Sequence, residues 1–352
     1  MRIETIGDAT LYLGDAMASL RAMPPASVQT CVTSPPYWGL RDYGVEGQIG
    51  LEPTPEEYVA KIVAVFREVW RVLRDDGTLW VNLGSSYASA ACVPLAKASV
   101  SPGALQSVDN SCLNYALFSQ YVKPKDLVPI PWMVAMALQK DGWYLRSDII
   151  WAKPNPMPES VTDRPTKAHE YLFLLTKSER YFYDTKAIAE PSIDPESLRP
   201  EGRNPRGDDK FCQATLDERR NGAARTREGF SKLAGGCYLT RNRRSVWTIA
   251  TTPYKGAHFA IYPRALVEPC ILAGSREGDM VLDPFGGSGT TAAVALSLGR
   301  RAIICELKPD YAELIRERIK SEESFVQPRL FPSPPQSDPV RRPLPPKRGF
   351  LF

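Results

Sequence analysis

Three glycines stand close together in the segment Asp283-Pro284-Phe285-Gly286-Gly287-Ser288-Gly289-Thr290-Thr291. A strand-like apolar run precedes them and a helix-like run follows, so the first amides of that helix point at any ligand the turn approaches. Glu306 ends the next strand-like run, 23 residues after Asp283, near the spacing at which a carboxylate accepts from both ribose hydroxyls of a nucleoside. No lysine follows the glycines, which excludes a Walker phosphate loop. The segment predicts a site for a nucleoside-containing cofactor, with a plain tight turn as the alternative.

A second group of residues, Thr33-Ser34-Pro35-Pro36-Tyr37-Trp38, follows another short apolar run. Consecutive prolines have no backbone N–H and are held extended, so their carbonyls project as fixed acceptors. With the Ser34 hydroxyl beside them and the flat ring of Tyr37, they could bind both N–H groups of an aromatic amine while its ring stacks. The alternative is a loop plugged by an aromatic side chain, and Trp38 either extends the stacking wall or belongs to the core.

Together and in this order, Ser34 to Tyr37 and Asp283 to Thr291 resemble the amine-binding and cofactor-binding motifs of the β-class amino-methyltransferases of DNA. The resemblance covers roughly residues 10–320. It also includes Gly14-Asp15, the run Trp151 to Asn155, the run His169 to Tyr171 and the run His258 to Pro263. It implies an α/β fold with a Rossmann-like, mostly parallel sheet that contains an antiparallel hairpin. It further implies S-adenosyl-L-methionine as cofactor, double-stranded DNA as partner, and a site-specific enzyme of the kind found in restriction-modification systems.

The resemblance also implies roles for individual residues. Ser34 and the Pro35 carbonyl would accept from the exocyclic amine of a flipped base, next to Pro36, and Tyr37 would stack on the base. The other residues it assigns would contact the cofactor: Phe285, Gly286, Gly287, Gly289 and Thr290 its methionine part, Asp283 its amino group, Glu306 its ribose, and Asp15 and Phe259 other parts of the pocket. His258 is either in that pocket or a structural hydrogen-bonding residue.

The base that is modified is open at this point. Members of this family whose motif begins with serine tend to methylate N4 of cytosine, whereas aspartate is commoner among N6-adenine enzymes. Ser34 therefore favours cytosine, with adenine as the alternative, because both amines offer the same two donors.

Other functions remain as rivals. Relatives that methylate RNA or a protein amide usually carry asparagine in place of Ser34 and put the cofactor motif first. A catalytically silent DNA-binding protein of the same fold is a rival of a different class. Pro269-Cys270 is similar to the nucleophile of C5-cytosine methyltransferases, but it precedes the glycine turn, and we interpret it as core packing.

Composition and charge indicate the size of the protein and where it could bind phosphates. The chain has 352 residues, a net charge of +4 and 43% hydrophobic residues, as expected of a globular protein with one large domain or two. Residues 199–244 carry a net charge of +6, which suits a surface that follows phosphates. Within it the candidate DNA-binding residues are Arg219, Arg220, Arg225, Arg227, Arg241, Arg243 and Arg244.

Several classes of protein are not expected. The chain has two histidines and seven cysteines without a CxxC pair, so we expect no metal site and no disulfide framework. It has no apolar run long enough to span a membrane and starts without a secretory signal, which favours a cytoplasmic protein.

The periodicity of the sequence predicts alternating strands and helices. Strands are expected at 28–33, 78–83, 143–151, 171–176, 280–282 and 301–305, and helices at 55–73, 131–140, 290–298 and 310–320. Thr54 and Glu57 form a capping box at the first of these helices.

These elements divide into four regions. Residues 1–185 and 245–325 are expected to form one catalytic domain, 186–244 an inserted target recognition region, and 326–352 a disordered proline-rich tail. In the tail, Gln327, Leu330 and Phe331 resemble the short peptides that bind the replication sliding clamp. Because the β class often dimerises, the resemblance also implies a homodimer.

Overall fold

One mixed sheet organises the computed structural model, which describes residues 1–87, 123, 125–191, 240–251 and 262–325. Within these residues the sheet has nine strands in the order β1-β2-β13-β12-β3-β4-β8-β7-β11. The strands are β1 Arg2–Ile6, β2 Ala9–Leu13, β3 Val28–Thr33, β4 Leu73–Leu83, β7 Tyr144–Ala152, β8 His169–Thr176, β11 Val246–Thr248, β12 Met280–Asp283 and β13 Arg301–Glu306. The central strands β2, β13, β12, β3 and β4 pair in parallel, and β1 and β8 run antiparallel to their neighbours. The predicted α/β class with a Rossmann-like sheet is confirmed.

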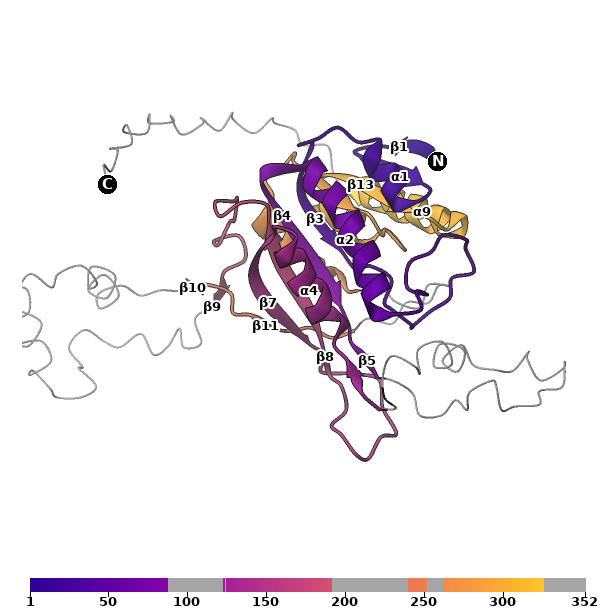
Figure 1. Ribbon diagram of the computed structural model, residues 1–352. Coiled ribbons are helices and arrows are strands. Elements are labelled where there is room, and N and C mark those ends of the chain that lie inside the picture. The colour runs from indigo at the N-terminus through magenta and orange to yellow at the C-terminus, as the bar shows by residue number, and fades with distance from the viewer. Residues whose placement is uncertain (88–122, 124, 192–239, 252–261, 326–352) are drawn as a thin grey trace, which may run out of the picture.

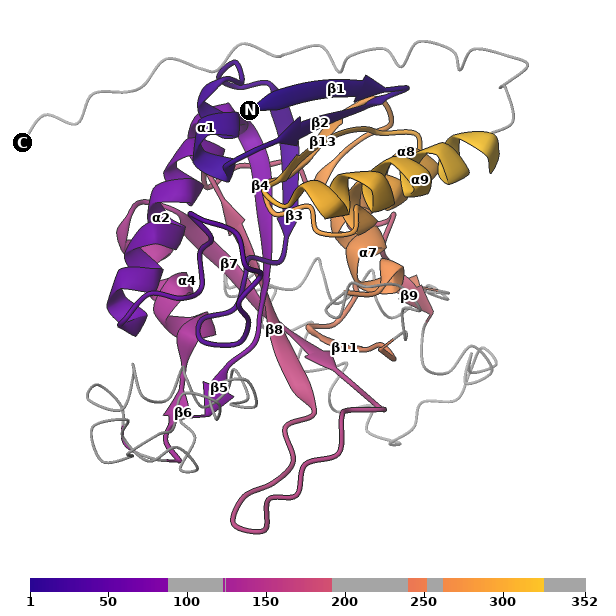
Figure 2. The ribbon, with the colours of Figure 1, turned by 90° about the vertical axis from the view of Figure 1, so that its right-hand side faces the viewer.

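Helices cover both faces of the sheet. They are α1 Ala16–Arg21, α2 Pro55–Val72, α4 Ile130–Lys140, α7 Arg264–Gly274, α8 Thr290–Ser297 and α9 Pro309–Phe325. Figure 1 shows α2 and α4 in front of the strands, and Figure 2 shows α1, α2 and α4 on one face with α7, α8 and α9 on the other. Because both faces are covered, all six residues of β3 are buried.

The sequence explains why α2 forms where it does. Thr54 caps the helix by accepting from the Glu57 amide at 3.1 Å, and Pro55 occupies the first turn, where its missing N–H costs nothing. Its buried residues recur at helical spacing, from Tyr58 through Ile62 and Phe66 to Val69. The helix lies where the periodicity predicts it.

Several features differ from the sequence-based expectation. Helices α1 and α7 were not predicted, nor were the short strands β5 Ser86–Tyr87, β6 Leu127–Val128, β9 Glu190–Pro191 and β10 Thr240–Arg241. β4 begins at Leu73, five residues before the predicted start, because the chain becomes extended directly after α2 and its register shifts opposite Val28 and Thr30. The edge hairpin β1–β2 and the short strand β11 were not predicted. Edge strands are half-exposed, so they lack the continuous apolar run that marks a buried strand.

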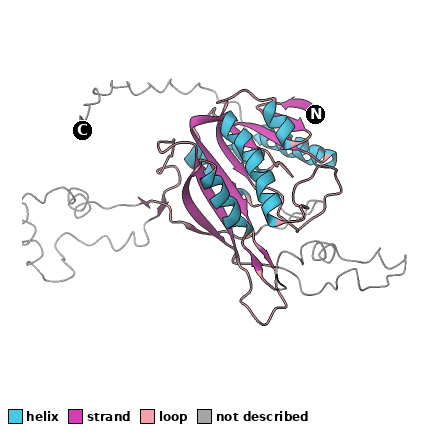
Figure 3. Ribbon diagram, in the orientation of Figure 1, coloured by secondary structure: helices cyan, strands magenta, loops and turns pink. Residues whose placement is uncertain are grey.

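Strands β3 and β12 are adjacent and their connections diverge, and we refer to the carboxyl edge between these two strands as the crevice. From β3 the chain crosses by α2 to β4 on one side, and from β12 it crosses by α8 to β13 on the other. In parallel sheets, ligands bind at the carboxyl ends of strands where the connections diverge in this way. The loops at this edge, drawn in pink in Figure 3, are therefore the candidate binding site.

The ends of the predicted insertion lie side by side. Strand β9 Glu190–Pro191 pairs antiparallel with β10 Thr240–Arg241, and Thr240 is directly opposite Pro191. The residues between them, 192–239, and the tail from 326 lie outside the described residues. A further short pair, β5 Ser86–Tyr87 with β6 Leu127–Val128, lies at the carboxyl edge of the sheet.

Candidate active site

The two motifs predicted from the sequence lie beside each other in the crevice. β3 pairs in parallel with β12, so Ser34 and the glycine turn leave the same edge of the sheet from adjacent strands. The Thr33 hydroxyl, one residue before Ser34, donates to Asp283 Oδ1 at 2.7 Å. Residues 250 positions apart in the chain are thereby joined at the point where the amine motif and the cofactor turn begin.

The glycine turn has a geometry that other residues cannot adopt. A Cβ on Gly286 would lie 1.9 Å from Ile304 Cγ2, since its amide donates to the Cys305 carbonyl and draws the turn against β13. Gly287 and Gly289 have φ of 53° and 78°, in the left-handed region that glycine enters without strain. The glycines bring the backbone close to β13 and place the start of α8 at the crevice.

Glu306 ends β13 next to this turn. Its Oε2 accepts from the Gly287 amide at 2.7 Å and its Oε1 from the Lys308 amide at 2.8 Å. Each carboxylate oxygen has a further lone pair with which it can accept from a hydroxyl. Burial raises the pKa of Glu306 to about 7 despite these two amide donors. A carboxylate with spare acceptor capacity, beside a glycine turn and a helix start, fits the ribose diol of S-adenosyl-L-methionine.

Asp283 is enclosed rather than open to the crevice. In addition to Thr33, its carboxylate accepts from the Phe285 amide at 3.1 Å, from Thr291 Oγ1 at 2.6 Å and from the Tyr262 hydroxyl at 3.0 Å. Burial raises the pKa of Asp283, and these four donors oppose that rise. The carboxylate therefore connects β3, β12, α8 and the chain before α7, a role that the sequence did not indicate.

Two other predicted cofactor residues are also held by the fold. The Thr290 hydroxyl accepts from Arg318 of α9 at 2.7 Å, so it faces that helix. Phe285 is half-buried against the core cluster that underlies α1 and α2. Phe259 and His258 lie outside the described residues.

Asp15 lies close to Glu306 although it belongs to the other end of the chain. It caps α1 by accepting from the Ala18 amide at 2.9 Å, and the amide of the preceding residue, Gly14, donates to the Glu306 carbonyl at 2.8 Å. Tyr43 and Tyr311, which the sequence did not single out, also lie near Glu306. Burial raises the pKa of each tyrosine, and the Glu306 charge adds to the rise. No motif marks these two residues, because folding alone brings them to the site.

A network of polar side chains holds Tyr37. Its hydroxyl donates to Glu170 Oε2 at 2.7 Å, and Asn82 Nδ2 donates to both the Tyr37 hydroxyl and Glu170 Oε2, at 2.7 and 2.8 Å. Lys153 pairs with the other oxygen of Glu170. Burial, with the Glu170 charge next, raises the pKa of Tyr37 well above its ordinary value. The ring of Tyr37 is thus held by the ends of β4, β7 and β8.

Further contacts pack around the Ser34–Tyr37 motif and the neighbouring Trp38. A Cβ on Gly84 would lie 2.8 Å from the Tyr37 ring, so the glycine leaves room for that ring. The Pro36 carbonyl accepts from the Tyr58 hydroxyl at 2.8 Å, so α2 helps to hold the backbone of the motif. Trp38 is 3% exposed and donates to the Glu52 carbonyl, so it belongs to the core.

The remaining candidates from the sequence are a cysteine of α7, the arginines near the insertion and the tail motif. Cys270 is buried within α7, in agreement with core packing. Arg241 and Arg244 both pair with Glu190, at 3.1 and 2.8 Å, and Arg243 lies over the Trp247 ring at 4.5 Å. The other arginine candidates, and Gln327, Leu330 and Phe331, lie outside the described residues. The described arginines are thus engaged at the base of the insertion.

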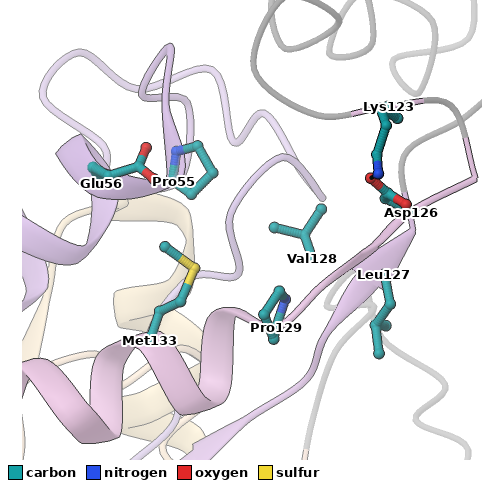
Figure 4. A pocket seen from close by; sticks show the side chains of 8 residues that line it. All are labelled: Pro55, Glu56, Lys123, Asp126, Leu127, Val128, Pro129 and Met133. Atoms are coloured by element: carbon teal, nitrogen blue, oxygen red, sulfur yellow. Dashed lines mark ion pairs between the residues drawn. The ribbon is translucent and has the colours of Figure 1, made fainter.

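A separate hollow lies between the starts of α2 and α4. Figure 4 shows its lining, in which Met133 of α4 lies across from Pro55 and Glu56, with Lys123 and Asp126 on the far side. None of the predicted site residues lines it, and its cation Lys123 pairs with Asp126. It offers no chemistry related to the crevice.

Metal-binding clusters and membrane spans are both absent from the residues that the structure describes. Among them no cluster of histidine, cysteine, aspartate or glutamate could hold a metal ion. No helix in those ranges is long and apolar enough to cross a membrane.

Known DNA methylases resemble this chain in sequence over most of its length. Residues 28–317 match the family model N6_N4_Mtase, described as DNA methylase. The Type II methyltransferase M.Cfr9I of Citrobacter freundii is 44% identical over 91% of this chain and 91% of its own length. The Type II methyltransferase M.SmaI of Serratia marcescens is 44% identical over 88% of this chain and 90% of its own.

Solved structures agree in fold. TTHA0409 from Thermus thermophilus, complexed with S-adenosyl-L-methionine, superposes with a TM-score of 0.53 at 25% identity, covering 89% of this chain and 93% of that one. The cytosine-N4-specific PvuII DNA methyltransferase gives a TM-score of 0.55 at 19% identity, over 91% of this chain and 93% of that one, which supports the fold alone. The match over residues 28–317 includes both motifs of the crevice, and the chain belongs to the DNA methylase family, as a Type II amino-methyltransferase of DNA.

Proposed function

We propose that this DNA methylase transfers a methyl group from S-adenosyl-L-methionine to the exocyclic N4 of a cytosine flipped out of a specific duplex sequence. The observation that carries the proposal is the adjacency of Ser34 and the glycine turn, joined through the Thr33–Asp283 hydrogen bond. This adjacency would bring an amine receptor and a nucleoside site to one crevice. The choice of cytosine rests on serine at position 34.

The residues of the crevice suit the cofactor. Glu306 would accept from its ribose hydroxyls, and the backbone of Gly286, Gly287 and Gly289 would hold its methionine part beside the start of α8. When bound, S-adenosyl-L-methionine supplies an electrophilic methyl group on a sulfonium. Asp15, Tyr43 and Tyr311, which lie near Glu306, would contribute to the wall of that pocket.

The chemistry at the base requires positioning more than acid or base strength. The lone pair of the amine is delocalised into the ring, so the nitrogen must move toward tetrahedral geometry before it attacks. Acceptors at Ser34 Oγ and the Pro35 carbonyl favour that geometry and the positive charge that develops on nitrogen. After the nitrogen–carbon bond forms and the sulfur–carbon bond breaks, one proton leaves the nitrogen through Ser34 or water. No covalent bond between enzyme and base is needed, in keeping with the burial of Cys270.

The target recognition role belongs to residues 186–244 in this proposal. Its support is the +6 charge of residues 199–244 and the pairing of β9 with β10, which holds the two ends of the segment 192–239 together. Residues 1–185 and 245–325 together form the catalytic domain.

The test begins with unmethylated DNA treated with the purified protein and S-adenosyl-L-methionine, followed by mass spectrometry of its nucleosides. We expect N4-methylcytosine, and none with the Ser34→Ala/Tyr37→Ala variant. N6-methyladenine would overturn the choice of base while keeping the fold and the transfer chemistry. Absence of any methylated base over a range of DNA substrates, with the cofactor still binding in a titration, would favour a silent DNA-binding protein.

A further inference from the structure

A long hairpin loop leaves the sheet beside the crevice. It connects β7 to β8 through residues 153–168, and both views show it projecting from the body of the molecule at the carboxyl edge of the sheet (Figures 1 and 2). Figure 3 shows that the projecting part has neither helix nor strand. Its two ends adjoin Lys153 and Glu170, the ion pair that supports Tyr37. The loop therefore starts at the wall of the proposed base pocket.

The base and sides of the loop are held firmly. The Lys153 amide donates to the Ala168 carbonyl at 2.8 Å and closes the hairpin. Asn155 exchanges two hydrogen bonds with the Thr251 backbone, at 2.9 and 3.1 Å. On the returning arm, the Arg164 guanidinium lies 3.6 Å from the centre of the Tyr87 ring. These contacts orient the loop at the edge of the sheet rather than leave it free.

The outgoing arm carries an unusual side chain. Met157 is 86% exposed, the largest exposed fraction among the large hydrophobic residues that the structure describes. It stands between Pro156 and Pro158, and Pro154 precedes them. Proline restricts the backbone, so little conformational entropy is lost when such an arm is inserted into a partner. A stiff arm that presents one flexible apolar side chain has the form of a wedge.

We propose that Met157 enters the DNA duplex and occupies the space left by the flipped base, an inference that rests on the proposed function. Extraction of a base costs a few kcal/mol of stacking and pairing, and apolar side chains inserted between base steps are a known way of stabilising unstacked DNA. The four residue steps from Lys153 to Met157 span at most about 14 Å. That reach exceeds the depth of either groove of B-DNA, roughly 7.5 to 8.5 Å.

The experiment compares two duplexes that contain the methylation site mapped with the wild-type protein. One is fully paired, and the other has an abasic site opposite the target base, which removes the cost of unpairing. On the paired duplex, Met157→Ala reduces the single-turnover methylation rate at least tenfold. On the abasic duplex, the single-turnover rate of Met157→Ala is expected to lie within about threefold of the wild-type rate. Met157→Leu, which keeps the apolar wedge, stays close to wild type on both.

A matched control is Met136→Ala, since Met136 is 63% exposed on α4 and outside the loop. It is expected to match wild type on both duplexes. The proposal is overturned if Met157→Ala is as fast as wild type on the paired duplex, or if its loss is equal on the two duplexes. If the wild-type protein methylates no DNA from which a site can be mapped, the proposed function fails, a result that differs from a wedge without effect.

Discussion

Tyr37 depends on residues that lie far from it in the sequence. Glu170 accepts from its hydroxyl and also pairs with Lys153, so a change at Glu170 alters the ring and the neighbouring cation together. A displacement of a reacting group by about 1 Å can cost as much as 100-fold in rate. Under the proposed function, Glu170 would therefore be a positioning residue, because it holds the Tyr37 ring on which the base would stack.

Glu170→Gln is expected to lower the single-turnover methylation rate about tenfold while cofactor affinity stays within about threefold of wild type. The amide keeps the size of the side chain but loses the charge that holds Lys153 and Tyr37. Tyr37→Phe should show a similar loss, and the double variant no further loss, because the two residues act as one unit. Rates and cofactor titrations of the three variants measure this. Losses that multiply in the double variant would contradict the link.

Glu306 leads to a prediction about pH. Its pKa is about 7 in the cofactor-free protein, and ribose hydroxyls bind best to the ionised form. A proton therefore competes with the cofactor: affinity is highest well above pH 7 and falls as pH decreases through 7, by up to about tenfold per unit. Calorimetric titrations with S-adenosyl-L-methionine between pH 6 and 8.5 measure the slope.

Glu306→Gln provides the control for that slope. The variant is expected to bind the cofactor more weakly at pH 8.5 and to lose most of the dependence on pH, since glutamine does not titrate. If its affinity kept the wild-type slope below pH 7, another group would have to be responsible.

At the scale of elements, the glycine turn depends on its fit against β13. Gly286→Ala introduces a Cβ within 1.9 Å of Ile304 Cγ2, a side chain held inside a buried strand, so the turn must move away. We expect a loss of about 1–3 kcal/mol in stability, typical of overpacking, and a weaker cofactor affinity because Gly287 and Glu306 separate. Thermal unfolding and cofactor titration check both effects.

Gly142→Ala is the comparison for that variant. Gly142 has φ of 113° and no atom within 4 Å of its added Cβ, so the substitution strains the backbone without a clash. It should reduce stability and leave cofactor affinity unchanged. Equal cofactor affinity in the Gly286 and Gly142 variants would show that the fit against Ile304 is unimportant.

At the scale of the whole molecule, we expect that residues 192–239 can be removed without loss of the proposed catalytic domain. Pro191 and Thr240 are directly opposite each other in the β9–β10 pair, so a short glycine-containing turn can replace residues 192–239. The shortened protein is expected to keep its fold and to bind S-adenosyl-L-methionine within about threefold of wild type, while methylation of specific DNA falls at least 100-fold. Circular dichroism, cofactor titration and methylation assays test it.

Retention of specific methylation by the shortened protein would remove the target recognition role from residues 186–244. Loss of cofactor binding together with the fold would instead show that the insertion belongs to the catalytic domain.

Much of this molecule could be predicted from local patterns. The buried strands, the capped helix after Thr54 and the glycine turn leave strong signals, because a continuous apolar run, a capping box and clustered glycines each reflect interactions between near neighbours in the chain. The order of the two motifs was enough to indicate the class of enzyme. The half-exposed edge strands left no such signal and were missed.

Contacts between distant residues could not be predicted in this way. Asp283 was expected to face the cofactor, but its carboxylate is enclosed by Thr33, Thr291 and Tyr262, from three other segments. The support of Tyr37 by Glu170, across 133 positions, follows from the pairing of β4 with β8, and the approach of Tyr43 to Glu306 from the path of a loop. Sequence patterns report the chemistry that a residue offers and the element that carries it, whereas partners come from strand order and register, which emerge only when the whole chain packs.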